Sequence, residues 1–169
     1  MEIQLTQGKT AIFDDEDKDL IVNNKWYTKN NSGFFYAVRT DRSVKPRRTV
    51  FMHRLVLGVT DPKVFVDHIN HNTLDNRKCN LRACSHAENM QNGIKTKKNK
   101  TSQYKGVSFR VQRRNGVVVH TGWLSQIGYQ GKTVYAKLFK CEKEAALAYD
   151  KIAPKYFGEF ASLNFPQTI

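Results

Sequence analysis

The sequence has no apolar run long enough to cross a bilayer, and its first residues lack the basic start and apolar stretch of a signal peptide. We therefore expect a cytoplasmic protein with no membrane partner. Cysteine is scarce, since Cys79, Cys84 and Cys141 are odd in number and form no Cys-x-x-Cys pair. These counts argue against a disulfide framework and against a structural zinc site built from cysteines.

Acidic residues are also in short supply. The 169 residues include 15 aspartates and glutamates against 28 lysines and arginines, a formal net charge of +13. A soluble chain with this excess usually meets a polyanion, and nucleic acid is a better candidate than an anionic membrane surface. A highly soluble protein with no charged partner is the alternative. The length allows one ordinary domain or two small ones.

Apolar stretches alternate with turn residues over the first 50 residues. We expect strands at 10–13 and 19–22. A β-hairpin is expected at 25–38, because aromatic and β-branched runs there flank an Asn-Asn-Ser-Gly turn. A basic, turn-like segment follows at 39–48, and residues 51–57 form a pattern typical of a short helix that ends at a glycine.

A strand is expected at 63–68, ending in two polar residues, with a polar loop at 69–78 after it. Ser85 and Glu88 are spaced as a capping box, which predicts a short helix over 86–91.

Residues 94–102 are rich in lysine and have almost nothing apolar, which predicts a flexible basic linker. After it the alternating pattern resumes, and we expect three strands and one helix, at 106–111, 117–128, 132–139 and 142–157. Pro154 is expected to kink this helix or to mark its end. The pattern predicts a three-stranded antiparallel sheet packed on one helix.

The stretch from Val66 to Arg82 concentrates His, Asp and Asn between a strand and a helix. Hydrolysis of a phosphodiester needs a base to activate water and a cation to offset developing charge. Asp67 offers a hard oxygen ligand suited to magnesium or manganese. His68 can be the base because imidazole titrates near neutrality, and the amide carbonyl of Asn80 could hold its other nitrogen. A polar loop whose side chains only cap turns is the alternative.

This region resembles the HNH endonucleases, and in particular the phage homing endonucleases. Their ββα-metal motif runs from Asp-His on a strand, through Asp-Asn-Arg and Asn-Leu-Arg, to Glu-Asn on a helix. The chain has these pieces in that order, over about residues 50–93, at Asp67-His68, Asp75-Asn76-Arg77, Asn80-Leu81-Arg82 and Glu88-Asn89. The resemblance implies Asp67 and Asn89 as metal ligands, His68 as general base and Asn80 as the residue that orients His68.

Asn89 stands where the family's name has histidine. Because an amide oxygen is a weak neutral ligand, we expect one hydrated divalent cation, Mg²⁺ or Mn²⁺, and no structural zinc. His53, His71 and His86 receive no firm role. Arg54 and Arg82 are either phosphate-binding residues or surface charges.

The C-terminal stretch is similar to the plant ethylene-response-factor (Apetala-two) type of DNA-binding domain, over about residues 103–166. The matching pieces are Tyr104-Lys105-Gly106-Val107, Trp123-Leu124-Ser125-Gln126-Ile127, Leu138-Phe139, the run from Glu144 to Asp150 and the run from Gly158 to Pro166. This resemblance implies a three-stranded sheet that lies in the DNA major groove. The loop between the first two strands departs from the family.

Strand alternation assigns the two faces of this sheet. The face toward the helix is expected to carry Val107, Phe109, Val111, Trp123, Ser125, Ile127, Val134, Ala136 and Leu138. The opposite face then carries Ser108, Arg110, Gln112, Gln126, Gly128, Thr133, Tyr135 and Lys137. By position in the family, the resemblance implies DNA-binding roles for Lys105, Ser108, Arg110, Gln126, Thr133 and Tyr135, and Lys137 on the same face is added to them. In the major groove, Arg can read guanine and Gln can read adenine. A polar, solvated sheet face is the alternative.

The expectation is an α+β chain of two domains. N-terminal β-hairpins at 1–50 and a ββα-metal motif at about 51–93 form a nuclease domain at 1–93, and a basic linker at 94–102 leads to a DNA-binding domain at 103–169. The expected function is hydrolysis of DNA phosphodiester bonds by a site-specific homing endonuclease, acting on double-stranded DNA as a monomer or homodimer.

Two alternatives stay open. One is a non-catalytic DNA-binding regulator with a degenerate HNH module. The other is an RNA-binding or membrane-surface protein, which the lack of an RNP-type aromatic motif and of an amphipathic basic helix disfavours.

Overall fold

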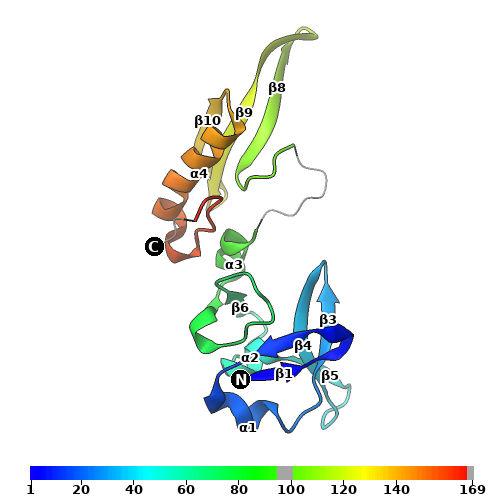
Figure 1. Cartoon of the computed structure of the whole chain (residues 1–169). Coiled ribbons are helices and arrows are strands. Elements are labelled where there is room, and N and C mark those ends of the chain that lie inside the picture. The colour runs from blue at the N-terminus through cyan, green and yellow to red at the C-terminus, as the bar shows by residue number, and fades with distance from the viewer. Residues whose placement is uncertain (95–100, 167–169) are drawn as a thin grey trace. The chain divides into compact units, whose positions relative to one another are not determined.

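The computed structural model describes residues 1–94 and 101–166, which form two compact units, Met1–Met90 and Gln91–Ile169 (Figure 1). Both units mix helices and strands, in keeping with the expected α+β class. Of the expected linker at 94–102, residues 95–100 lie outside the described residues. Within the described ranges, no helix is long and apolar enough to cross a membrane.

The first unit is built from three small antiparallel sheets within the fully described residues 1–90. They pair β1 (Glu2–Gln4) with β2 (Thr10–Ile12), join β3 (Tyr27–Asn31), β4 (Phe34–Asp41) and β5 (Arg48–Phe51), and pair β6 (Phe65–His68) with β7 (Leu81–Cys84). The helices are α1 (Lys18–Ile21), α2 (Met52–Val56) and α3 (His86–Asn92), with single 3₁₀ turns η1 (Thr6–Gly8), η2 (Asp15–Asp17) and η3 (Lys78–Asn80).

Several expected elements of this unit are confirmed. The hairpin is β3–β4, and its turn residues Ser32 and Gly33 have φ angles of 53° and 94°, which explains the polar residue and the glycine there. The helix at 51–57 is α2, followed by Gly58 with a φ of 64°.

Other expectations for this unit are wrong. Residues 19–22 are not a strand, because α1 turns Ile21 into the core while Leu20 and Val22 stay exposed. The segment at 39–48 is not all turn, since β4 continues to Asp41. β7 was not expected from the residue pattern.

The core of the first unit lies beneath the strand that carries the Asn-Leu-Arg piece. It consists of Leu5, Ala11, Phe13, Ile21, Trp26, Ala37, Met52, Val56 and Leu81. The indole of Trp26 donates a hydrogen bond to the carbonyl of Ile21 at 2.9 Å, so its one polar atom is satisfied inside the core. Because Leu81 of β7 belongs to this core, the β6–β7 pair packs against the other elements of the unit.

The second unit is the expected sheet and helix. β8 (Val107–Arg114), β9 (Val117–Tyr129) and β10 (Lys132–Phe139) form an antiparallel sheet in the order β10-β9-β8, and α4 (Glu142–Phe157) covers one face (Figure 1). The helix continues through Pro154 and ends at Gly158, whose φ is 54°, before a 3₁₀ turn, η4 (Gly158–Phe160).

One face of α4 packs on the sheet. Its buried residues are spaced so that they form one stripe along the helix, and they are Ala145, Ala146, Tyr149, Ala153 and Phe157. The ring of Tyr149 lies against Gly106, where an added Cβ would come within 2.0 Å of a ring carbon. This contact explains the glycine of the Lys105-Gly106-Val107 piece, which also has a φ of 71°.

A β-bulge in β10 reverses part of the expected face assignment. Thr133 pairs with Gly128, but Tyr135 pairs with Ile127, so Val134 is an extra residue. Residues directly opposite in the ladder share a face. Tyr135 and Lys137 therefore lie on the helix side.

The bulge corrects our assignment of Tyr135 and Lys137 to the outer face. It also corrects Ala136 and Leu138, which pair with Gln126 and Leu124 on the outer face.

β8 and β9 run on beyond β10 as a two-stranded ribbon (Figure 1). The last β10 pair is Phe139 with Trp123, whereas the β8–β9 ladder continues to Arg114 with Val117. Phe109 and Val111, expected under the helix, are 38% and 48% exposed. Phe109 pairs with Trp123 at the last position that β10 reaches, and Val111 lies beyond it. We call residues 110–122 the ribbon.

Candidate active site and nucleic-acid interface

The loop between β6 and η3 is held by the beginning of the chain. Asn76 N donates to the carbonyl of Ile12 at 2.7 Å, and Ile12 N donates to the carbonyl of Leu74 at 2.8 Å. Thr73 Oγ1 donates to the carbonyl of Phe35 at 2.6 Å. The N-terminal hairpin and β4 therefore position the loop that carries the Asp-Asn-Arg piece.

Asp75 and Arg77 of that piece stabilise the loop itself. Arg77 donates to Asp75 through Nε at 2.8 Å and through Nη2 at 2.7 Å, and Asn70 Nδ2 adds a third bond at 3.0 Å. Asp75 is only 2% exposed. The hydrogen bonds from Arg77 hold the pKa of Asp75 below its usual range, so this carboxylate stays ionised within the loop.

Asn80 makes three hydrogen bonds with the loop between β6 and η3. Its Oδ1 accepts from Asn70 N at 2.9 Å, and its Nδ2 donates to the carbonyl of Asp75 at 2.8 Å. Its carbonyl accepts from Ile69 N at 2.9 Å. Asn80 thus joins the start of the loop to the segment at Asp75.

Asp67 and His68 lie side by side in sequence at the end of β6, and both are buried, with 6% and 5% exposure. Asp67 pairs with Arg82 across the β6–β7 ladder. Arg82 Nε and Nη2 lie 2.9 Å and 2.8 Å from Asp67 Oδ2. Arg82 is therefore not a surface charge, because its side chain is only 12% exposed and is committed to this carboxylate.

Arg54 also differs from the expectation. Its guanidinium donates to the carbonyls of Val64 and Asp61, each at 2.7 Å, and so fixes the turn before β6. This turn determines where β6, the strand that carries Asp67, begins.

The imidazole of His68 is packed between rings. The ring centroids of His53 and Tyr36 lie 5.1 Å and 6.2 Å from it. Burial lowers the pKa of His68 below its ordinary value, while the neighbouring Asn76 side chain, Asp67 and Asp75 act in the opposite direction. Since a lowered pKa favours the neutral ring at neutral pH, His68 can accept a proton.

His53 is a residue that the sequence left without a role. It comes from α2, is 7% exposed and contacts Phe51, Tyr36 and His68. Burial, with the nearby His68 and Arg54, lowers the pKa of His53 to about 3, so it is neutral at any physiological pH. A polar residue inside an apolar helix pattern was the only signal in the sequence.

The helix that carries Asn89 begins with the expected capping box. Glu88 Oε2 accepts from Ser85 N at 2.7 Å, and Ser85 Oγ accepts from Glu88 N at 3.3 Å. Asn89 is half-buried and follows directly in this first turn of α3. The order of elements is thus β6, loop, β7 and α3, with Asp67-His68 on the first strand and Asn89 on the helix.

Among the described residues, one group of three acidic side chains has ligand oxygens within 4.8 Å of one another: Asp14, Glu16 and Asp17. Lys78 already engages it, because Lys78 Nζ lies 2.7 Å from Glu16 and 3.2 Å from Asp17. Lys78 N also donates to Asp14 at 2.7 Å. The group therefore anchors Lys78, the first residue of η3, and is not the expected metal site.

In the second unit, the outer face of the sheet holds part of the expected DNA-binding set. The ladder places Ser108, Arg110 and Gln126 on this face, together with Thr133 before the bulge. Gln126 Nε2 donates to Thr133 Oγ1 at 3.1 Å, which shows that these two side chains share the face. The sequence has no aspartate or glutamate between Glu88 and Glu142, so the three strands carry only basic charge.

Comparison with known proteins assigns the chain. A family model for HNH endonuclease matches residues 50–91. A protein of Acanthamoeba polyphaga mimivirus, named an uncharacterized HNH endonuclease, is 33% identical over 163 residues, which are 95% of this chain and 78% of that protein. The chain belongs to the HNH endonuclease family. This membership supports a nuclease function with DNA as substrate.

Part of this HNH endonuclease also matches a second relative. An AP2-like ethylene-responsive transcription factor of Arabidopsis thaliana is 43% identical over 68 residues, which are 40% of this chain and 13% of that protein. The similarity is therefore limited to a small part of the plant protein. No solved structure matches the chain.

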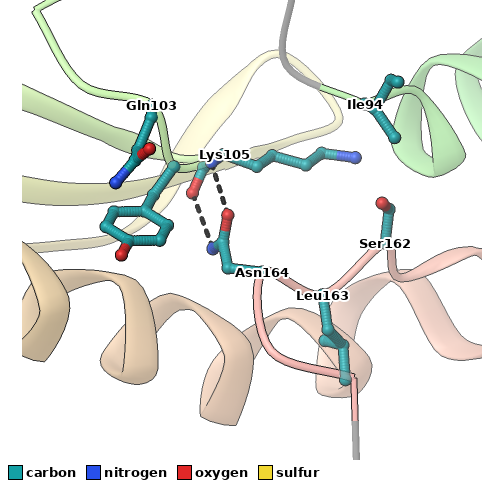
Figure 2. Close-up of a pocket in the computed structure, with 7 residues that line it drawn as sticks. Ile94, Gln103, Lys105, Ser162, Leu163 and Asn164 are labelled. Atoms are coloured by element: carbon teal, nitrogen blue, oxygen red, sulfur yellow. Dashed lines mark hydrogen bonds between the residues drawn. The ribbon is translucent and has the colours of Figure 1, made fainter.

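The structure places Lys105 of the HNH endonuclease away from the outer face. Its Nζ donates to the carbonyl of Gly93 at 2.7 Å and to that of Gln91. Its backbone N donates to Asn164 Oδ1 at 2.6 Å, and its carbonyl accepts from Asn164 Nδ2 at 3.1 Å (Figure 2). A pocket of about 280 Å³ lies beside this pair, and its polar lining groups are those that hold the unit together.

Proposed function

We propose that this HNH endonuclease is a site-specific homing endonuclease, of the kind that phages encode, which hydrolyses DNA with one divalent cation. The observation that carries the proposal is the pairing of Asp67 and His68 at the buried end of β6, on the hairpin that leads into the helix with Asn89. This order and placement support the proposal of a ββα-metal arrangement.

His68 is the general base in this proposal. Burial favours its neutral form, and a neutral imidazole can take a proton from the attacking water. Asn80 acts on it indirectly, because its hydrogen bonds set the loop that places Asn76 beside the imidazole. The loop thus restricts how His68 can turn.

Asp67 and Asn89 are the proposed cation ligands. A carboxylate and a carboxamide offer only oxygen, which fits a hard cation such as Mg²⁺ or Mn²⁺ and does not fit structural zinc. The ion pair with Arg82 fixes the direction of the Asp67 carboxylate, which a ligand requires. When bound, the cation would supply charge stabilisation at the scissile phosphate.

The sheet of the second unit is proposed to recognise the DNA sequence that is cleaved. Ser108, Arg110, Gln126 and Thr133 share the outer face, and a face without carboxylates suits a polyanion. Lys105, Tyr135 and Lys137 leave this set, since the contacts of Lys105 and the bulge in β10 place them elsewhere. The proposed partner is double-stranded DNA, bound by a monomer or a homodimer.

Cleavage of supercoiled plasmid with Mg²⁺ tests the nuclease assignment. The wild-type chain should produce open-circular or linear plasmid, and chelation by EDTA should stop the reaction. His68→Ala and Asp67→Ala should bind DNA and fail to cleave it, while His86→Ala, at an exposed histidine, should cleave normally. An inactive wild-type chain that binds DNA would favour a non-catalytic regulator.

Site specificity needs its own test. Cleavage products from a plasmid library with a randomised insert should share a sequence. Arg110→Ala should relax this preference while leaving the Mg²⁺-dependent cut intact. Random cleavage by the wild-type chain would contradict the homing assignment but not the nuclease.

A further inference from the structure

Four rings pack together around the proposed base. The centroid of the His53 ring lies 5.1 Å from the ring centroid of His68, 5.3 Å from that of Phe51 and 5.6 Å from that of Tyr36. Tyr36 closes the group, at 6.2 Å from His68 and 5.9 Å from Phe51. These residues come from β4, the end of β5, α2 and β6, and the rings from β4 and α2 contact the His68 imidazole directly.

We propose that His53 is a positioning residue for His68, and that its ring holds the His68 imidazole edge-on in the direction needed to take a proton from water. The planes of the two rings meet at 77°, the arrangement in which the positive edge of one ring faces the negative face of the other. This inference rests on the proposed role of His68 as base.

The contact acts through the ring and not through a hydrogen bond. The buried Nδ1 of His53 has no hydrogen-bond partner among residues 1–94 and 101–166. Burial also keeps His53 uncharged, so it does not repel a proton on His68. A flat side chain of similar size is therefore the property that position 53 requires, and phenylalanine is its conservative replacement.

The test compares three chains in single-turnover cleavage of supercoiled plasmid, with enzyme in excess and Mg²⁺ present. His53→Phe should keep the cleavage rate within about threefold of the wild type. His53→Leu, which retains bulk but no ring, should cleave about 10- to 100-fold more slowly. DNA affinity measured without Mg²⁺ should be equal in all three.

The outcomes separate this inference from the nuclease assignment. Wild-type cleavage together with an inactive His68→Ala chain would establish the base first. Equal rates for His53→Leu and the wild type would then overturn the positioning role. Loss of activity in His53→Phe as large as in His53→Leu would show that the nitrogen matters and would overturn it as well.

A second pair of variants covers the case in which His53→Leu does not fold. Tyr36→Phe should retain the rate, and Tyr36→Leu should slow cleavage without changing DNA affinity. In each folded leucine variant, NMR should show the His68 ring protons losing the shift that the removed ring imposes, whereas the phenylalanine variants should retain it. An unchanged His68 spectrum in Tyr36→Leu would count against the ring group.

The ribbon carries an independent inference. Within it, Val117, Val118 and Val119 are 66%, 46% and 53% exposed, although β-branched side chains usually favour partial burial. Arg113 and Arg114 lie exposed next to the Asn115-Gly116 turn. The ribbon belongs to the stretch of the sequence that has no carboxylates, so nothing on it opposes binding of an anion.

We infer that the ribbon contacts duplex DNA beyond the base pairs that the sheet reads, with Arg113 and Arg114 against backbone phosphates. A two-stranded β-ribbon fits the major groove, and arginines at its turn reach the sugar-phosphate backbone beside it. This inference rests on DNA binding by the second unit.

The dependence of DNA affinity on salt measures such contacts. Each phosphate contact adds about 0.9 to the slope of log affinity against log salt. The double variant Arg113→Ala/Arg114→Ala should reduce that slope by about 2 on a duplex without Mg²⁺. The matched control is Lys151→Ala/Lys155→Ala on α4, which removes the same charge from exposed positions away from the sheet and should leave the slope unchanged.

Equal slopes for the ribbon variant and the wild type would overturn the ribbon contact while leaving plasmid cleavage, and thus the nuclease, in place. An equal decrease in the control would show a general charge effect and would overturn it too. So would a concentration-dependent dimer that the ribbon variant abolishes, since the ribbon would then bind another copy.

Discussion

The guanidinium of Arg82, on the neighbouring strand, binds the carboxylate of Asp67. Its Nε lies 2.9 Å and its Nη2 lies 2.8 Å from the same oxygen, Asp67 Oδ2. The two residues are directly opposite in the β6–β7 ladder. The proposed metal ligand is thus held by a cation of the protein itself. A divalent ion at Asp67 would lie close to a positive guanidinium, so we expect tight metal binding only when DNA phosphate is present.

The ion pair gives a first prediction. Arg82→Gln leaves a buried carboxylate without its cation and should destabilise the first unit by about 3 kcal/mol, with loss of cleavage. The double variant Asp67→Asn/Arg82→Gln should recover most of that stability, because no charge is then buried alone, and should stay inactive. Urea unfolding and plasmid cleavage measure both effects. Equal stability of Arg82→Gln and the wild type would contradict a structural role for the pair.

His53 gives a pH prediction. Its folded-state pKa is about 3, below the ordinary 6.5 that the unfolded chain retains. Above pH 6.5 neither state binds the proton, so protonation of His53 does not affect the free energy of unfolding there. As the pH falls from 6.5 toward 3, only the unfolded state gains the proton, and stability drops by about 1.4 kcal/mol per pH unit.

His53→Phe should therefore flatten the acid side of the stability curve of the first unit. Trp26 fluorescence in a Trp123→Phe background reports unfolding of this unit, since the chain has two tryptophans. His120→Phe, at an exposed histidine of the second unit, is the control and should change nothing. An unaltered acid slope in His53→Phe would contradict the lowered pKa.

Asn80 gives a third prediction. Asn80→Ala removes both side-chain hydrogen bonds that fasten the loop and should slow cleavage by about 10- to 100-fold. Hydrogen exchange at the Asn70 amide should accelerate, because that N–H donates to Asn80 Oδ1. Asn80→Asp should behave similarly, since a carboxylate cannot donate to the Asp75 carbonyl. Slow cleavage with a fully protected Asn70 amide would point instead to a direct contact with His68.

Asp150 gives a prediction for the second unit. It accepts hydrogen bonds from Asn164 N at 2.9 Å, Asn164 Nδ2 at 3.0 Å and Phe165 N at 2.8 Å. Asp150→Ala should cost about 2–3 kcal/mol, since hydrogen bonds to a charged group are lost. Thermal unfolding and exchange at the Phe165 amide check this. Lys151→Ala is the neighbouring control, and an equal loss of stability in that variant would contradict a stabilising role for the Asp150 hydrogen bonds.

The sequence predicted much of the secondary structure because its signals are local. The helix at 142–157, the strand at 132–139 and the capping box at Ser85 depend on residues a few positions apart. The bulge at Val134 could not be predicted that way. One extra residue reverses every later face of β10, and alternation alone carries no sign of it.

The candidate site was predictable in part for the same reason. The motif order singled out Asp67, His68 and Asn89, and their roles remain proposals. The partners of these residues depend on contacts across the fold. Arg82 reaches Asp67 only through strand pairing, and His53 reaches His68 from a different helix. A single sequence gives no register and no tertiary contact, so both partners were missed.

The link between Lys105 and Asn164 brings the beginning and the end of the second unit to the same spot, with Asp150 securing the closing segment. A module whose entry and exit are adjacent can be spliced into a surface loop of a host protein without pulling that loop apart. The sheet and its helix should therefore keep their fold when they are inserted into a surface loop of another protein.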